Sequence, residues 1–127
     1  MPRPPTVSDA ELEVLKVLWD AGPSTVRDVA AVLRRRRRRL AYNTVLTLLS
    51  RLRDKGFVDA DRRDTAHLFR AIVTRDELVD SSLAALAARV CDGAASPLLL
   101  ALVRGQRFSA EEIAHFRRLL DDLTPKD

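Results

Sequence analysis

Residues 33–58 read LRRRRRRLAYNTVLTLLSRLRDKGFV, and this stretch decides the fold. Past its arginines, apolar residues recur at the three- and four-residue spacing of one helix face. They are Val45, Leu48, Leu49 and Leu52. Lys55 and Gly56 supply a basic last turn and a residue suited to the left-handed backbone that often follows a helix. The stretch predicts an amphipathic helix that ends before Gly56, and its start among residues 40–42 stays open because no strong N-cap residue stands there.

The arginine run, Arg34–Arg39, lies between two amphipathic segments, so a folded domain holds its charge. Six adjacent guanidinium groups repel one another, and the run must therefore face water or a polyanion. Nucleic acid is the first candidate, and a solvated basic loop is the alternative. Residues 24–75 hold 14 Lys and Arg against 5 Asp and Glu, whereas residues 1–23 and 76–127 carry net charges of −2 and −3. A polyanion is therefore expected to contact one segment of the chain.

Three helix starts share one signature, a Ser or Thr followed three residues later by Glu, which is the pattern of a capping box. An apolar pair flanks each of them at the positions of a hydrophobic staple. The caps are Ser8 with Glu11, Thr74 with Glu77 and Ser109 with Glu112, and the staples are Val7 with Leu12, Val73 with Leu78 and Phe108 with Ile113. The signature predicts helices that begin just after residues 8, 74 and 109.

Two short helices are predicted before the arginine run. The first covers about Asp9–Asp20 and stops at the breaker formed by residues 21–23. Its inward residues are expected to be Leu12, Leu15, Leu18 and Trp19. The second begins after Ser24 or Thr25 and carries one apolar stripe, formed by Val26, Val29, Ala30 and Leu33. The run is then the end of this helix plus a connection to the next.

A β-hairpin is predicted after Gly56. Phe57, Val58 and Ala60 alternate with polar positions, residues 61–65 form a charged turn, and residues 66–73 form a second strand. Three helices followed by a hairpin is the order of a winged helix-turn-helix domain. We assign residues 8–74 to such a domain and expect the proline-rich residues 1–7 to be disordered. The fold class is mainly α with a small β-hairpin.

Residues 75–127 are predicted to form a helical dimerisation domain of three helices. They carry more apolar surface at helical spacing than so small a unit hides from water, including the wholly apolar residues 97–103. The residues expected to mediate self-association are Leu83, Leu86, Val90, Ile113, Phe116 and Leu120. Packing back onto the winged domain is the alternative. We favour dimerisation because helix-turn-helix domains usually act on two half-sites.

The third helix is the candidate reading element. With its apolar stripe in the core, helical geometry turns Asn43, Thr44, Thr47 and Arg51 outward. Asn pairs with adenine through two hydrogen bonds, Thr bonds a base edge or touches a thymine methyl, and Arg reaches guanine or phosphate. An ordinary polar helix face is the alternative. The neighbouring arginines and hairpin favour base reading.

Phosphate contacts are assigned to the arginine run and to the hairpin tip. The residues are Arg34, Arg35, Arg36, Arg37, Arg38 and Arg39, with Arg62 and Arg63 at the tip. Contiguous guanidinium groups point in several directions and cannot all reach base edges, so the run should supply affinity more than discrimination. A solvated turn is the alternative for the two arginines of the tip.

Composition argues against several other functions. The sequence has no Gly-rich phosphate loop and only two histidines, His67 and His115, so we expect no catalytic site, cofactor or metal. Cys91 is the only cysteine, which excludes an intramolecular disulfide, and we expect it to be buried. No stretch approaches the roughly 20 apolar residues of a membrane span. We therefore expect a soluble cytoplasmic protein with no membrane insertion.

The tract Ala41–Val58 resembles the BlaI/MecI penicillinase-repressor family, most specifically in its Thr44, Val45, Thr47, Leu48 and Leu49 pattern and its RLRDKGFV ending. SDAELEVLKVLW, from Ser8, is similar to that family's first helix, and residues 24–33 are similar to its second. HLFRAIVTRDEL, from His67, resembles the strand that enters the dimerisation region. The resemblance implies a homodimeric repressor that binds palindromic operators of double-stranded DNA, with Asn43, Thr44 and Thr47 touching the DNA.

The chain departs from the family pattern in several places. Six arginines stand where relatives have a less basic connection, and Leu40 lies near a common aromatic position. In antibiotic-sensing members a membrane sensor triggers cleavage near an Asn-Phe pair, which the similar stretch at residues 100–103 lacks. A membrane sensor-protease partner is therefore implied only by the resemblance. A copper-responsive branch uses a cysteine cluster, which one cysteine cannot supply.

The expected function is a sequence-specific DNA-binding repressor, relieved by proteolysis or by another signal acting on the C-terminal region. Two rival functions remain. One is a sequence-tolerant nucleoid-type protein in which the arginines supply nearly all of the affinity for DNA. The other is a winged domain that contacts only proteins.

Overall fold

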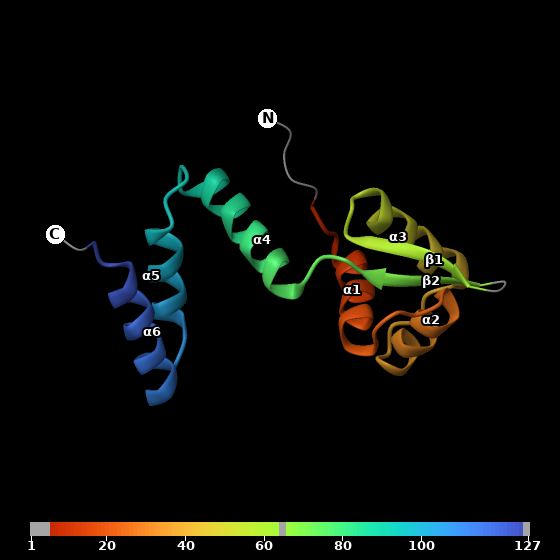
Figure 1. The fold of residues 1–127 in the computed structure, drawn as a ribbon, viewed down its shortest axis with the longest axis horizontal. Helices are drawn as coiled ribbons and strands as arrows, with labels where there is room; N and C mark the ends of the chain where they lie inside the picture. The colour runs from red at the N-terminus through yellow and green to blue at the C-terminus, as the bar shows by residue number, and fades with distance from the viewer. Residues whose placement is uncertain (1–5, 64–65, 126–127) are drawn as a thin grey trace. The chain divides into compact units, whose positions relative to one another are not determined.

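The computed structural model describes residues 6–63 and 66–125, which form six helices and one antiparallel hairpin. The elements are α1 (Asp9–Ala21), α2 (Val26–Arg35), α3 (Tyr42–Asp54), β1 (Val58–Arg63), β2 (Ala66–Ala71), α4 (Arg75–Val90), α5 (Ser96–Gly105) and α6 (Ala110–Leu123) (Figure 1). The predicted fold class is confirmed. The chain divides into two compact units, of which the first ends at Ala85 and the second begins at Leu86. This division falls inside α4, whereas the winged domain was expected to end at residue 74.

The helix starts follow the predicted caps. The Ser8 hydroxyl accepts from the backbone N–H of Glu11, and the Glu11 carboxylate accepts from the N–H of Ser8, each at 3.2 Å. Ser109 and Glu112 form the same capping box, and the Thr74 hydroxyl accepts from the N–H of Glu77 at 3.0 Å. Of the two candidates for α2, Thr25 is the N-cap. Each cap satisfies N–H groups that the first turn of a helix leaves without partners.

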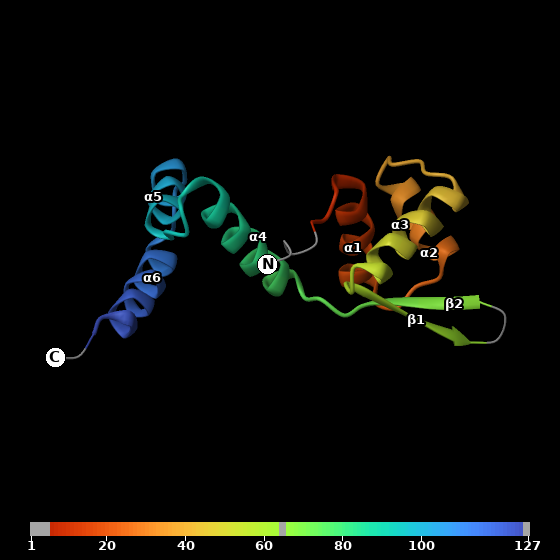
Figure 2. The ribbon, with the colours of Figure 1, turned by 90° about the horizontal axis from the view of Figure 1, so that it is seen from above.

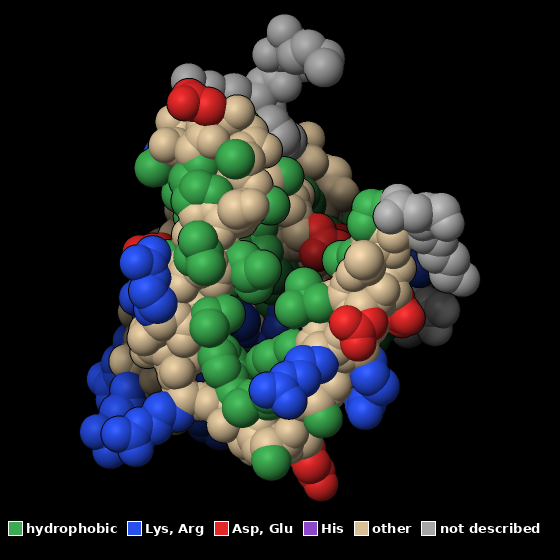
Figure 3. Space-filling view, turned by 90° about the vertical axis from the view of Figure 1, so that its left-hand side faces the viewer, with side chains coloured by type: hydrophobic (Ala, Val, Ile, Leu, Met, Phe, Trp, Pro, Cys, Tyr) green, Lys and Arg blue, Asp and Glu red, His purple; other side chains and the backbone are tan. Residues whose placement is uncertain are grey.

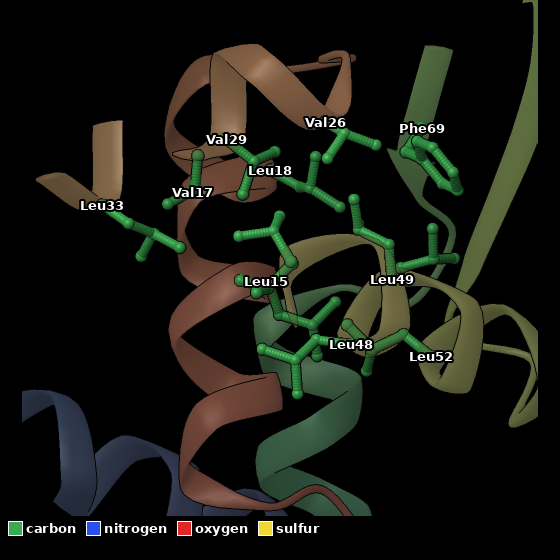
Figure 4. Close-up of a cluster of buried hydrophobic side chains, with 13 residues drawn as sticks. Leu15, Val17, Leu18, Val26, Val29, Leu33, Leu48, Leu49, Leu52 and Phe69 are labelled. Atoms are coloured by element: carbon green, nitrogen blue, oxygen red, sulfur yellow. The ribbon is translucent and has the colours of Figure 1, made fainter. Parts of the chain in front are cut away.

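One hydrophobic core joins α1, α2 and α3 to the hairpin (Figure 4). Its buried members are Val14, Leu15, Val17, Leu18, Val26, Val29, Leu33, Val45, Leu48, Leu49, Leu52, Val58 and Phe69. The predicted stripe of α3 is confirmed. On α1 the expectation was partly wrong, because Leu12 and Trp19 are only half-buried whereas Val14 and Val17 are buried. α1 packs against both α2 and α3, so its buried face is wider than one leucine stripe.

The hairpin lies along one side of the three helices (Figure 2). Its register pairs Val58 with Ala71 and Arg63 with Ala66, so β1 continues through residues expected to form a turn, and β2 ends two residues earlier than expected. Asp64 and Thr65, also assigned to that turn, lie outside the described residues. Ser24 extends the sheet, since its N–H donates to the Phe69 carbonyl at 2.9 Å and its carbonyl accepts from the Phe69 N–H at 2.8 Å.

An ion pair between a half-buried lysine and a buried glutamate ties the end of α3 to the start of α1. The Nζ atom of Lys55 lies 2.8 Å from both carboxylate oxygens of Glu11, which is 2% exposed. Lys55 also donates to the Thr6 carbonyl at 2.7 Å. Burial raises the pKa of Glu11, but hydrogen bonds from Lys55 and Ser8 outweigh it, and the pKa lies below its ordinary value.

The expected N-terminal disorder falls mostly on residues 1–5, which lie outside the described residues. Thr6 and Val7 are placed against the head, the name we give to α1, α2, α3, β1 and β2 together. The Thr6 carbonyl accepts from Lys55, and Val7 packs against the hydrophobic core. Thr6 and Val7, which were expected to be disordered, therefore make defined contacts.

The second unit has little core of its own. Ala87 is its one buried apolar residue among those described, and Phe108 meets Phe116 edge-to-face with ring centroids 5.1 Å apart. Its exposed large apolar residues are Val90, Leu99, Leu100, Leu102, Val103, Ile113, Leu119, Leu120 and Leu123, and Leu86 lies at the boundary. Figure 3, in which the left-hand side of Figure 1 faces the viewer, shows hydrophobic side chains gathered on the surface. Cys91 is half-buried, not buried as expected, because it follows the last turn of α4 at a bend.

Candidate nucleic-acid interface

The outward side of α3 carries polar side chains. Because Val45, Leu48, Leu49 and Leu52 fix the inward side of the helix, the opposite side is determined by the 3.6-residue period. Asn43, Thr44, Thr47 and Arg51 are all exposed, as the sequence predicts. Their exposure is the geometry that base reading requires. Contact with DNA by these four residues stays a prediction.

Thr47 makes one hydrogen bond that limits what it can offer a base. Its hydroxyl donates to the Asn43 carbonyl one turn earlier, with 2.9 Å between the oxygens. The hydroxyl hydrogen is thus used, whereas the oxygen lone pairs and the methyl group stay available. Thr47 is therefore suited to accept from a base amino group or to contact a thymine methyl.

The start of α3 lacks a side-chain cap. Ala41 occupies the N-cap position, and no side chain bonds the first N–H groups of the helix. Because this capping group is missing, the sequence alone did not fix the residue at which α3 begins. Arg34 and Arg39 line an open surface hollow together with Leu40 and Ala41. Positive charge therefore gathers around the end of α3 at which the helix dipole is also positive.

The arginine run is a helix end followed by a connection, as predicted. Arg34 and Arg35 form the last turn of α2, and all six arginines are exposed. The Arg38 N–H donates to the Leu33 carbonyl at 2.8 Å and the Arg37 N–H donates to the Arg34 carbonyl at 3.0 Å. These two bonds form a Schellman motif. Arg37 sits at its left-handed position with φ of 64°, a conformation that favours glycine.

The two C-terminal turns of the head can be compared directly, since α3 ends in the same motif. The Phe57 N–H donates to the Leu52 carbonyl at 2.9 Å and the Gly56 N–H donates to the Arg53 carbonyl at 3.0 Å. Gly56 has φ of 83°, which confirms its predicted position after the helix. At the left-handed position after the helix, α2 thus has Arg37 where α3 has Gly56. An arginine at this position keeps the six arginines consecutive but leaves the backbone strained.

The hairpin of β1 and β2, which we call the wing, presents one described arginine at its tip. Arg62 is exposed and pairs in register with His67 of β2. The backbone of Arg63 belongs to β1, but its side chain lies outside the described part of the structure. Lower on the hairpin, Asp59 pairs with Arg70 at 3.3 Å. The Ala60 N–H and then Arg70 hold the pKa of Asp59 below its ordinary value.

Two arginines that the sequence pattern did not single out line a hollow beside α3. Arg27 lies in the first turn of α2, and Arg53 lies on the flank of α3 that faces the wing. Arg53 stands eleven residues after Tyr42, which is three helical turns along the same flank. That spacing is the signal that could have found it. The predicted base-reading residues lie at the centre of the outward side of α3, whereas Arg53 lies on its flank.

Other chemistries find little support within the described residues. Residues 6–63 and 66–125 contain no group of three or more His, Cys, Asp or Glu side chains placed to hold a metal ion. His115 lies exposed on α6. In that same part of the chain, no helix is long and apolar enough to cross a membrane.

The fold and the exposed polar and basic side chains define a DNA-binding winged helix-turn-helix protein. The sequence model of the penicillinase repressor family matches residues 7–122, and the chain belongs to this family of transcriptional repressors. The family consists of regulators and not of enzymes, in agreement with the expectation that the chain is not a catalyst.

Relatives of this chain are similar over most of its length. The transcriptional regulator BlaI of Mycobacterium tuberculosis is 39% identical over 119 residues, which cover 92% of this chain and 84% of the relative. The penicillinase repressor of Bacillus licheniformis is 24% identical over 122 residues, covering 96% and 94%. A solved structure of Bacillus licheniformis BlaI, monomeric and bound to the blaP half-operator, is similar with a TM-score of 0.49 and 27% identity, covering 61% of this chain and 93% of that chain.

Proposed function

We propose that this chain is a sequence-specific repressor that binds a palindromic DNA operator as a homodimer. The observation that carries the proposal is the exposed polar side of α3 beside six exposed arginines, in a member of a repressor family. Because the proposed ligand is the operator DNA, the proposed place of action is the cytoplasm.

Base reading is assigned to Asn43, Thr44, Thr47 and Arg51, and phosphate binding to Arg34–Arg39 with Arg62 and Arg63. This division follows from which DNA groups each side chain can contact. An α-helix such as α3 fits a major groove, where its outward side chains would face the base edges. The exposed arginines beside α3 supply affinity that depends on salt, because each phosphate contact releases counterions.

Dimerisation is assigned to residues 75–127, and DNA binding to residues 8–74. Five of the six residues expected to mediate self-association are exposed, namely Leu83, Leu86, Val90, Ile113 and Leu120. Phe116 is half-buried against Phe108. α5 supports the same assignment, because it is apolar on several sides yet has no buried residue, and an apolar helix requires cover. A second copy supplies that cover and gives the spacing for two half-sites.

Relief of repression is assigned to a signal that acts on the helical C-terminal region, by proteolysis or otherwise. The exposed apolar face of α5 and α6 supports this choice, because a change that separates two copies there would halve the DNA contacts available to one molecule. A membrane sensor with a linked protease is one source of such a signal.

The test begins with selection of duplexes from a random pool by the wild-type protein. Thr47→Val and Asn43→Ala should then bind the selected duplex more weakly while their affinity for random DNA changes little, because the lost contacts are to bases. Thr47→Ser separates the two roles open to Thr47, since it keeps the hydroxyl and loses the methyl. Ser82→Ala removes an exposed hydroxyl from α4 and serves as the control.

A sequence-tolerant nucleoid-type protein is the competing function. In that case selection yields no common sequence, and the α3 variants lose equal affinity for the selected and random duplexes. Either result contradicts the proposal. Replacing Arg38 and Arg39 with Ala should weaken binding to both duplexes alike and flatten the salt dependence by about two counterions.

A further inference from the structure

A surface hollow of about 740 Å³ lies between the start of α2, one flank of α3 and strand β2. We call it the wing hollow. Its apolar lining includes Leu46, which is 37% exposed, and Phe69, which is 2% exposed. Its polar lining includes the guanidinium-bearing Arg27 and Arg53 and the hydroxyl-bearing Tyr42 and Ser50. The wing hollow thus combines an apolar wall with positive charge from two helices.

No acidic side chain among the described residues forms an ion pair with the arginines of the wing hollow. Within residues 6–63 and 66–125, neither Arg27 nor Arg53 has an ion-pair partner, whereas Arg36 is paired with Asp20 and Arg70 with Asp59. Both unpaired arginines are exposed. No described carboxylate occupies their guanidinium groups, which have the two-pronged geometry that suits the two free oxygens of a phosphodiester.

The position of the wing hollow relates it to the reading residues. Ser50 lines it and stands one turn after Leu46 and two turns after Tyr42 on the same flank of α3. The adjoining outward side of α3 carries Asn43 and Thr47. A DNA strand whose bases meet those two residues must pass its backbone along one flank of the helix, because a major groove is bounded by phosphates on both sides.

We propose that the wing hollow seats the sugar–phosphate backbone of one DNA strand, with Arg27 and Arg53 holding neighbouring phosphates. This inference rests on the proposed function. The apolar wall of Leu46 and Phe69 suits the carbon face of deoxyribose, and the hydroxyls of Tyr42 and Ser50 are further donors to phosphate oxygens. The wing hollow adds two anchors that come from different helices, so it fixes the register of α3 on the duplex.

The experiment uses the full chain with Arg27→Ala and Arg53→Ala, and with Arg89→Ala, an exposed arginine of α4, as the matched control. Affinity for the selected and random duplexes is measured by fluorescence anisotropy over a range of salt concentrations. Each hollow variant should weaken binding to both duplexes by a similar factor and reduce the salt slope by about one contact, whereas Arg89→Ala should leave it unchanged. Arg53→Lys should keep the slope, because it keeps the charge.

Phosphate ethylation interference gives a readout that a purely structural role would not move. Ethylation of the phosphates that the protein contacts should block binding of the wild-type protein. Ethylation of the phosphate that Arg53 holds should have no effect on binding of Arg53→Ala. An interference pattern and salt slope identical to wild type in both hollow variants would overturn the inference, while a preserved preference for the selected duplex would leave the proposed function standing. If the wild-type protein itself bound the selected and random duplexes equally well, that result would contradict the proposed function instead.

Discussion

Asp20, near the end of α1, accepts a hydrogen bond from Arg36 of the arginine run, with 2.9 Å between Oδ2 and Nη2. Its other carboxylate oxygen lies 3.8 Å from Nη2 of Arg75, whose guanidinium also covers the Trp19 ring at 5.2 Å from the centroid. One of the six arginines is therefore already paired within the protein. An exposed pair of this kind adds about 0–1 kcal/mol to folding, so its larger effect falls on the charge available to DNA.

Asp20→Asn should tighten binding to random and selected duplexes alike. The change frees Arg36 for a phosphate, and the salt dependence should become steeper by about one contact. Asp80→Asn removes the same charge from an exposed site of α4 and is the control. Salt titrations of both variants distinguish the two causes, because equal changes would assign the effect to net charge and not to release of Arg36.

Arg37→Gly should stabilise the winged head by roughly 0.5–1 kcal/mol. Left-handed backbone costs an L-residue about 1–2 kcal/mol, and the greater unfolded-state freedom of glycine offsets only part of that cost. Arg38→Gly, next in the chain, has no positive φ to relieve and should not stabilise. Urea unfolding checks both variants, and a lower free energy of unfolding for Arg37→Gly would count against strain at this position.

The Glu11–Lys55 pair should make stability depend on pH in the acid range. Because the folded pKa of Glu11 lies below its ordinary value, its contribution is complete above the ordinary pKa and is lost as pH falls through the lowered one. Glu11→Gln should flatten this acid limb. Lys55→Met should cost about 1.5–3 kcal/mol at neutral pH, since it leaves a buried carboxylate without its charged donor. Parallel pH profiles for wild type and Glu11→Gln in urea unfolding would contradict this account.

Leu120→Asp should convert a dimer into monomers with weak operator affinity. Leu120 is 52% exposed on α6, so a charge there disrupts an apolar contact between copies without breaking a buried one within a copy. Phe116 is a poorer choice, since it packs on Phe108. Ile72→Asp places the same charge at another exposed apolar residue, just after β2, and should leave the dimer intact. Sedimentation equilibrium at the same protein concentrations measures both variants, and a dimeric Leu120→Asp would remove α6 from the proposed interface.

Features set by neighbours in the sequence were predictable. The capping boxes depend on residues three positions apart, and the stripe of α3 depends on one helix period, so Ser8, Ser109 and Val45 lie where the pattern predicts. The exposed side of α3 followed from the same period. The start of α3 could not be fixed, because Ala41 carries no capping group.

Features set by contacts between distant residues were not predictable. Burial of Val14 depends on α1 meeting two helices, which no single stripe encodes. The pairing of Arg36 with Asp20 joins residues sixteen positions apart, and six identical arginines give no sign of which one it is. The wing hollow needs the hairpin folded beside α2 and α3 before Arg27 and Arg53 share one surface.

The backbone bridge between Ser24 and Phe69 has a consequence for the order of folding during synthesis. The chain has made all of α1, α2 and α3 before Phe69 leaves the ribosome, yet the segment between α1 and α2 lacks its hydrogen-bonding partner until then. Contacts between residues so far apart in sequence form late because closing the intervening loop costs entropy. The head should therefore reach its native cooperativity only after β2 emerges, so that nascent chains halted before residue 69 are open to proteases that spare the completed head.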